Sequence, residues 1–131
     1  MQLMNSNLLS ADRVIKALPA EARKVLQVTV YDTVGSTNDV LREKKGQVAL
    51  HGAAVIADQQ TQGRGRRGRR WCSPAGANLY CSIGWRFAGS LEMLTGLSLA
   101  VGAMVAEQIT THFGADLQLK WPNDLYYNEQ K

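Results

Sequence analysis

Cysteine is scarce in this sequence, and the two cysteines present exclude the commonest cysteine-based sites. Cys72 and Cys81 lack the spacing of a metal-binding pair, and two thiols in a chain of 131 residues do not suggest a disulfide framework. No signal peptide opens the chain, and the uncharged apolar stretch at residues 93–106 is too short to cross a bilayer. We therefore expect a cytoplasmic protein with reduced thiols and without a membrane partner.

Basic residues are also few outside one short segment. The net charge is +4, but five of the fifteen basic residues are arginines within residues 64–70. Without those five, ten basic residues remain against eleven acidic ones. The positive charge is therefore local, which indicates a binding site for an anion and argues against a broadly basic surface for duplex DNA.

The hydrophobic pattern predicts an α+β fold in a chain whose length suits one domain. The expected elements, in chain order, are short helices at 8–18 and 19–26, a strand at 27–33, a helix at 37–45 that ends at Gly46, strands at 53–57 and 79–86, a buried helix at 91–113, and strands at 117–119 and 125–127. Ser10 is the expected N-cap of the first helix. Alternation predicts a buried face on the strand at 79–86 that carries Leu79, Cys81, Ile83 and Trp85.

This order of elements predicts one mixed β-sheet flanked by helices. Residues 1–26 have no place in that sheet, so we expect them to form connector helices ahead of a domain that occupies residues 27–131. The strand at 125–127 is followed by a turn at 128–129 but not by the second strand of a hairpin. We therefore expect these residues to be a portion of a longer protein.

The segment from Gln59 to Arg70 has no apolar residue, which predicts a loop, and residues 63–71 read Gly-Arg-Gly-Arg-Arg-Gly-Arg-Arg-Trp. Glycines let the backbone approach a ligand and turn N–H groups toward an anion. Guanidinium groups bind carboxylate and phosphate oxygens in pairs, and Trp71 can supply a flat surface for a base. The Gly-Lys-Ser/Thr ending of the phosphate loop is absent. A nucleic-acid-binding arm has a similar composition, so composition alone leaves both interpretations open.

Two further motifs carry chemistry. Lys-Trp-Pro-Asn-Asp at 120–124 places a lysine at the end of a strand, before a rigid turn that presents an amide and a carboxylate. Ser-Thr-Asn at 36–38 is a turn that can cap the following helix, and its hydroxyl and amide groups can bind a ligand that offers N–H donors and a carbonyl. Taken separately, each is also compatible with an ordinary strand end or helix cap.

Together and in this order, the motifs resemble the catalytic domain of biotin–protein ligases. Residues 63–71 are similar almost letter for letter to the biotinoyl-AMP binding loop of that family, and residues 120–124 match its second signature. Gln60 and residues 73–80 match positions on either side of the loop, and the resemblance covers residues 28–131. It implies the fold shared by biotin ligases and class II aminoacyl-tRNA synthetases, with the C-terminal strands and small β-barrel absent from this chain.

The resemblance also assigns roles to particular residues. The implied biotin-binding residues are Ser36, Thr37, Asn38, Gln60, Arg64, Gly65, Arg66 and Lys131. The implied ATP-binding residues are Arg66, Arg69, Trp71, Asn123 and Asp124. Arg66, Lys120 and Lys131 are the expected catalytic residues, and Asp124 is the expected ligand of Mg²⁺.

The activity that the resemblance implies is the activation of biotin with ATP to biotinyl-5′-AMP, followed by transfer to a lysine of a biotin carboxyl carrier protein. ATP, biotin and Mg²⁺ are the implied ligands, and a homodimer is a further expectation. Some members carry an N-terminal winged helix and repress transcription, so DNA is a partner only if the full-length protein has such a domain. Two alternatives stay open: a lipoate–protein ligase-like acyltransferase, whose family lacks this arginine loop, and a nucleic-acid-binding arginine-rich module.

Overall fold

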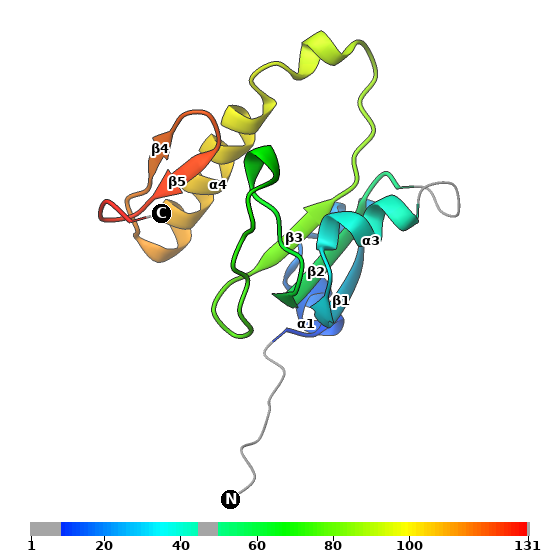
Figure 1. Ribbon diagram of the computed structural model, residues 1–131. Coiled ribbons are helices and arrows are strands. Elements are labelled where there is room, and N and C mark those ends of the chain that lie inside the picture. Colours follow the sequence, from blue (N-terminus) through cyan, green and yellow to red (C-terminus); the bar gives the residue numbers. More distant parts are fainter. Residues whose placement is uncertain (1–8, 45–49, 131) are drawn as a thin grey trace, which may run out of the picture. The chain divides into compact units, whose positions relative to one another are not determined.

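The computed structural model describes residues 9–44 and 50–130, which fall into two compact units divided after Phe87 (Figure 1). The first unit contains the Ser-Thr-Asn turn and the arginine loop, and the second contains the Lys-Trp-Pro-Asn-Asp motif. Each unit is described by itself below. The domain boundary expected at residue 26 remains a prediction.

A three-stranded mixed sheet forms the centre of the first unit. β1 (Gln27–Val34) pairs in parallel with β2 (Ala53–Gln60), which pairs antiparallel with β3 (Tyr80–Ile83). β2 is the middle strand, and its apolar run is buried on both faces, with Val55 only 1% exposed. The predicted strand at 53–57 is therefore confirmed, but pairing with β1 extends it to Gln60. The loop accordingly begins at Thr61, two residues later than expected.

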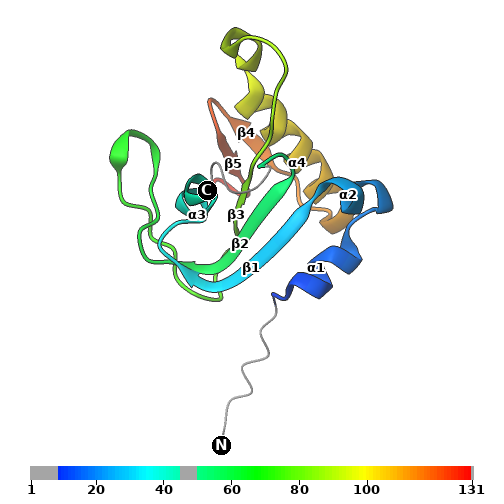
Figure 2. The ribbon, with the colours of Figure 1, turned by 90° about the vertical axis from the view of Figure 1, so that its right-hand side faces the viewer.

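Helices flank this sheet, as the α+β prediction requires. α1 (Ala11–Ala17) packs beside β1 and is followed by α2 (Ala20–Val25) (Figure 2). The Ser10 side chain accepts a hydrogen bond from the backbone N–H of Arg13 at 3.3 Å, which confirms the predicted cap. α3 (Thr37–Glu43) contacts β2 and β3 and buries Leu41. The predicted helix end at Gly46 lies outside the described residues.

The buried face of β3 is the opposite of the one expected. Tyr80 is 8% exposed, whereas Leu79 and Ile83 are 62% and 52% exposed. The reason lies in the neighbour: α3 lies over the face that carries Ser82 and supplies a hydroxyl to it, and the Tyr80 hydroxyl donates to the carbonyl of Pro74 at 3.2 Å. Hydrogen bonds thus hold the polar face of β3 inward, against its hydrophobic pattern.

The second unit is a helix packed on a hairpin. A 3₁₀ turn, η2 (Leu91–Leu94), precedes α4 (Leu97–Phe113), and β4 (Gln118–Lys120) pairs antiparallel with β5 (Asp124–Tyr126). Gly114 ends α4 in the left-handed conformation, which glycine adopts without strain. A Cβ at Gly102 would lie 3.0 Å from Leu119 Cδ2, so this glycine permits the close packing of α4 on β4. The described strands form two sheets rather than one.

The helix at 91–113 differs from the prediction in two respects. It is broken at Gly96, whose φ of 84° is left-handed, and most of α4 is not buried, since Met104 and Phe113 are 65% and 81% exposed. Leu91–Phe113 spans 23 residues and contains an 18-residue window with a mean hydropathy of 1.3, so by length and composition it is a candidate membrane span. The uncharged stretch at 93–106 is shorter than a membrane span, as expected, but the helical region that contains it passes the test of length and composition. One side of α4 packs on the β4–β5 hairpin.

Candidate ligand-binding site

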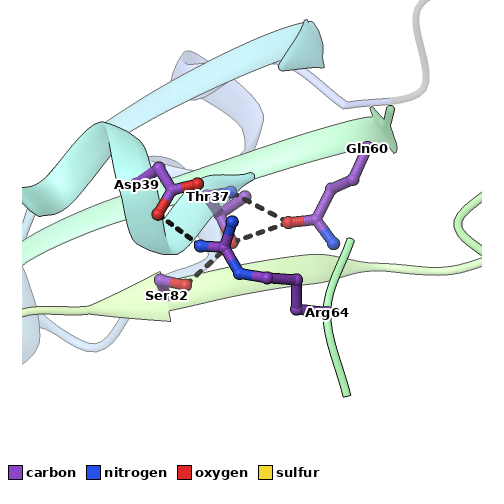
Figure 3. A network of polar contacts seen from close by, with 5 residues as sticks. All are labelled: Thr37, Asp39, Gln60, Arg64 and Ser82. Carbon is purple, nitrogen blue, oxygen red and sulfur yellow. Dashed lines mark hydrogen bonds and ion pairs between the residues drawn. The ribbon is translucent and has the colours of Figure 1, made fainter. Parts of the chain in front are cut away.

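A polar cluster joins the start of α3 to the ends of β2 and β3 (Figure 3). Gln60 Oε1 accepts hydrogen bonds from the backbone N–H and the hydroxyl of Thr37, at 2.8 and 3.2 Å. The Thr37 hydroxyl also lies 2.8 Å from Ser82 Oγ, and because its single proton goes to Gln60, Ser82 is the donor in that contact. Thr37 is 4% exposed. The cluster is thus held inside the first unit, on the side of the sheet that α3 covers.

The other end of the Gln60 amide is also held. Gln60 Nε2 donates to Ser73 Oγ at 3.3 Å, and Ser73 Oγ lies 3.5 Å from the carbonyl of Trp71, to which it donates. Ser73 is 5% exposed. These contacts fix the rotamer of the amide and connect it to the last residue of the arginine loop. Of the two N–H donors on Nε2, the Ser73 contact uses one.

The arginine loop has a hydrogen-bonded base and a tight tip. Trp71 N–H donates to the carbonyl of Gly63 at 2.8 Å, and Gly65 N–H donates to the carbonyl of Arg69 at 2.7 Å. The tip is a single 3₁₀ turn, η1 (Arg66–Gly68), in which Arg67 and Gly68 have φ of 59° and 72°. The segment is a loop, as predicted, but its two arms are paired.

Gly63 is the residue at the base of the loop where only glycine fits. A Cβ there would lie 2.6 Å from Ser73 Oγ and 2.8 Å from the carbonyl oxygen of Trp71. We expect Gly63→Ala to lower the free energy of unfolding by about 1–3 kcal/mol, because a buried overpacked methyl group displaces its neighbours. Gly65→Ala is the matched control, since Gly65 has φ of −89° and its nearest neighbour would be 3.5 Å away. Urea denaturation of both variants measures the difference, and equal midpoints would contradict it.

An ion pair connects the loop to α3. A guanidinium nitrogen of Arg64, Nη2, binds Asp39 Oδ1 in the first turn of the helix (Figure 3). The hydrogen bond from Arg64 lowers the pKa of Asp39, its charge and that of Arg42 act in the same direction, and partial burial opposes them. The same contact raises the pKa of Arg64. Because the carboxyl is protonated only below its lowered pKa, the pair is intact at neutral pH and is lost on acidification.

The structure brings only some of the predicted residues together. Thr37, Gln60 and Arg64 meet around the first turn of α3, with Ser36 buried directly before it. Asn38, Arg66 and Arg69 are exposed, and Trp71 is 44% exposed. Ser36 occupies the N-cap position of α3, as predicted, but its side chain makes no capping hydrogen bond.

The remaining predicted residues belong to the second unit. Lys120 ends β4 and stands opposite Asp124 in the hairpin register, with its Nζ 5.1 Å from the centroid of the Tyr126 ring. Asn123 Nδ2 lies 3.5 Å from Asp124 Oδ1. Lys131 is outside the described residues.

The same hairpin carries Asp124, the expected ligand of Mg²⁺. Within residues 9–44 and 50–130, no three His, Cys, Asp or Glu side chains gather as a metal site. Asp124 with the amide of Asn123 therefore fits Mg²⁺ only in its usual nucleotide-borne form, in which phosphates and water complete the coordination.

Three residues of the polar cluster were missed by the sequence-based prediction. Asp39 lies 25 residues from its partner Arg64, Ser73 lies 13 residues from Gln60, and Ser82 lies 45 residues from Thr37. Ser73 and Ser82 lie near the arginine loop in sequence, but nothing in one sequence indicates which side chains they contact. Asp39 follows the Ser-Thr-Asn turn, where an acidic residue is already explained by the helix dipole.

Comparison with known proteins agrees with the motifs. The sequence pattern of the Biotin/lipoate A/B protein ligase family matches residues 30–131. The chain is 42% identical over 125 residues to the bifunctional ligase/repressor BirA of Salmonella typhimurium, and 46% identical over 105 residues to that of Escherichia coli. These matches cover 95% and 79% of this chain but 37% and 32% of the relatives. The chain thus spans about a third of their length.

The fold is also similar to that of a solved biotin protein ligase. The biotin protein ligase of Aquifex aeolicus, in complex with biotin and ATP, matches with a TM-score of 0.62 and 35% identity, covering 77% of this chain and 41% of that one. Together with the agreement in sequence, this likeness confirms the predicted fold class.

Proposed function

Since the chain belongs to the biotin/lipoate A/B protein ligase family, we propose that the protein activates biotin with ATP to biotinyl-5′-AMP and transfers it to a lysine of a biotin carboxyl carrier protein. One observation carries the proposal most directly. The Gln60 amide, with its fixed rotamer, and the Arg64 guanidinium converge on the first turn of α3, so a binding site for a neutral polar ring adjoins a binding site for an anion. Biotin combines these two chemical groups.

The neutral ring of biotin is a cyclic urea with two N–H donors and one carbonyl. Ser36, Thr37 and Asn38 supply hydroxyl and amide oxygens to such a ring. Gln60 Oε1 already accepts two hydrogen bonds from Thr37, whereas Nε2 has a second N–H beyond the one used by Ser73. Gln60 therefore acts as a donor toward the ureido carbonyl, and the hydroxyl groups accept from the ring N–H groups.

The main obstacle in the first step is electrostatic, because a carboxylate oxygen must attack the α-phosphorus of ATP as the bond to pyrophosphate breaks. Arg64, Arg66 and Arg69 of the loop surround these anions with positive charge that is already in place, and each such contact lowers the barrier by roughly 3 kcal/mol. Lys120 and Lys131 are the further positive charges that the family resemblance assigns to this step. Gly65 has no side chain and lets the backbone approach the ligand closely, while its own N–H is bonded to the carbonyl of Arg69.

The nucleotide has its own group of residues. Trp71 is aromatic and 44% exposed, so it can stack on the adenine, while Asn123 and Asp124 bind the phosphate end. When Mg²⁺ is bound there, it neutralises phosphate charge, and Asp124 with Asn123 would hold it.

In the second step the Nζ of the carrier lysine attacks the acyl carbon of the adenylate, an amide forms, and AMP leaves. The chain's contribution is to hold the reactive anhydride away from water until the carrier arrives, which the loop over the adenylate achieves.

The proposal is tested by biotin-dependent exchange of labelled pyrophosphate into ATP, catalysed by the full-length protein that contains these residues. Exchange that requires biotin, and that lipoate does not support, is the expected result. Absence of exchange, together with tight binding of random oligonucleotides, would replace the ligase by an arginine-rich nucleic-acid module.

A second candidate function is transcriptional repression. It is favoured by the two relatives that are described as bifunctional ligase/repressors. The full-length protein would then bind a specific DNA site more tightly with biotin and ATP than without them, which a gel-shift titration measures.

A further inference from the structure

The first turn of α3 contacts two of the proposed ligand-binding residues at once. Thr37, its first residue, holds the Gln60 amide, and Asp39, two residues later, holds the Arg64 guanidinium. Figure 3 shows the Arg64 side chain running from the loop toward Asp39, beside the contact between Thr37 and Gln60. One short segment of backbone thus sets the relative position of an amide and a guanidinium.

The backbone between Gln60 and Arg64 is also constrained. Gly63 packs against Ser73, and its carbonyl accepts from Trp71, so the chain from Gln60 to Arg64 turns at a fixed point. The Arg64 side chain would still sample several rotamers, because arginine is long and flexible. Its contact with Asp39 selects one direction, toward α3, among them.

The ion pair leaves Arg64 accessible. The contact uses one nitrogen of the planar guanidinium, which has five N–H donors, and the side chain is 46% exposed. Because Asp39 is ionised and paired at neutral pH, it does not present a lone negative charge to an arriving anion. The arrangement therefore combines an oriented guanidinium with a surface that a carboxylate can reach.

We propose that Asp39 is a positioning residue that holds the Arg64 guanidinium beside the Thr37–Gln60 pair, ready for the acidic group of biotin or of its adenylate. The inference rests on the proposed function, because it takes that group as the ligand of Arg64. Ordering the guanidinium before binding removes part of the entropy that the ligand would otherwise have to overcome.

The test is the affinity of the full-length protein for biotin, measured by calorimetry, with the kinetics of pyrophosphate exchange alongside. Asp39→Ala should raise the Kd for biotin by about threefold to fivefold, the upper part of the range for an exposed ion pair. The exchange rate at saturating biotin should stay unchanged, since Asp39 does not touch the reacting atoms. Asp39→Asn keeps an oxygen that can accept from Arg64, so it should restore most of the affinity.

Two controls separate positioning from a general effect on folding. Glu43→Ala removes an exposed carboxylate from the last turn of the same helix and should leave the Kd unchanged. In an Arg64→Gln background, Asp39→Ala should have no further effect, because the contact is already lost. Tryptic cleavage within residues 64–70 should be faster in Asp39→Ala than in Glu43→Ala without any ligand, since one anchor of the loop is gone.

The outcomes distinguish the two proposals. Wild-type protein without biotin-dependent exchange overturns the proposed function, whatever Asp39 does. Normal exchange with an unchanged Kd in Asp39→Ala overturns only the positioning role. A tighter Kd in both Asp39→Ala and Asp39→Asn would also overturn it, since Asp39 would then compete with the ligand for Arg64. If Asp39→Ala weakened biotin binding equally in the Arg64→Gln background, its effect would not act through Arg64, and the positioning role would be overturned.

Discussion

Replacing Arg66 with glycine is expected to release biotinyl-5′-AMP from the full-length protein about 10- to 100-fold faster, because a hydrogen bond to a charged group contributes about 1.5–3 kcal/mol. Arg66 begins the 3₁₀ turn at the tip of the arginine loop, and its side chain is exposed. In the proposed mechanism its guanidinium binds the acyl-phosphate, which is the part of the adenylate that the ureido contacts do not reach. The freed adenylate should then label lysines of unrelated proteins in the same solution.

A neighbouring arginine gives a closely matched control. Arg67 lies in the same turn at a left-handed φ of 59°, a conformation that glycine adopts without strain. Arg67→Gly removes the same charge from the same turn, so it should leave adenylate release close to the wild-type rate. Rapid-quench measurement of labelled adenylate release compares the two variants. Equally fast release from both would reduce the role of Arg66 to net charge, and wild-type release from Arg66→Gly would refute it.

The fold was predictable where a local sequence pattern is compatible with only one kind of secondary structure. The apolar run at 53–57 is too short for a helix and forms part of the buried middle strand. Ser10 caps the first helix through its hydroxyl group, as predicted. The order of elements was sufficient for the α+β class. Matches of this kind depend on local chemistry, which the sequence contains.

The fold was less predictable where the outcome depends on a neighbour. On β3 the alternation correctly separates two faces, but it favours the apolar one, whereas Tyr80 and Ser82 are held inward by hydrogen bonds to Pro74 and Thr37. On α4 the apolar spacing correctly predicts a helix, yet Met104 is 65% exposed in the described residues. Periodicity predicts which residues share a face and does not specify what covers that face.

The candidate site divides in the same way. Gln60, Arg64 and the Ser-Thr-Asn turn were located from short strings of sequence, and the first unit brings Thr37, Gln60 and Arg64 into one network. Their assigned roles remain predictions. Asp39, Ser73 and Ser82 came only from the structure, because each joins the network through contacts with residues distant in the sequence. The sequence motifs identify the residues that are proposed to bind a ligand. The fold adds Asp39, Ser73 and Ser82, which contact and orient those residues.

Among the residues of the second unit, Lys120 is the one whose replacement should lower the rate of pyrophosphate exchange most. In the proposed mechanism it brings positive charge to the phosphates as the bond to pyrophosphate breaks, a role in which one donor is worth about 10²- to 10³-fold in rate. We therefore expect Lys120→Gln to lower pyrophosphate exchange at saturating biotin and ATP by about that factor. The affinity for biotin should change little, because the ureido contacts lie in the first unit. Calorimetry for biotin alone, next to the exchange assay, separates the two quantities.

The hairpin itself supplies the controls for that prediction. The Tyr126 ring lies 5.1 Å from the Lys120 ammonium, so Tyr126→Leu should lower exchange by only about twofold to fivefold, the value of an exposed cation–π contact. Tyr126→Phe keeps the ring face and should behave as wild type. Lys24→Gln removes an exposed lysine that pairs with Glu21 on α2 and should have no effect on exchange. If Lys120→Gln lost no more activity than Lys24→Gln, the positive charge at the end of β4 would have no part in the first step, and the loop arginines would have to provide that stabilisation by themselves.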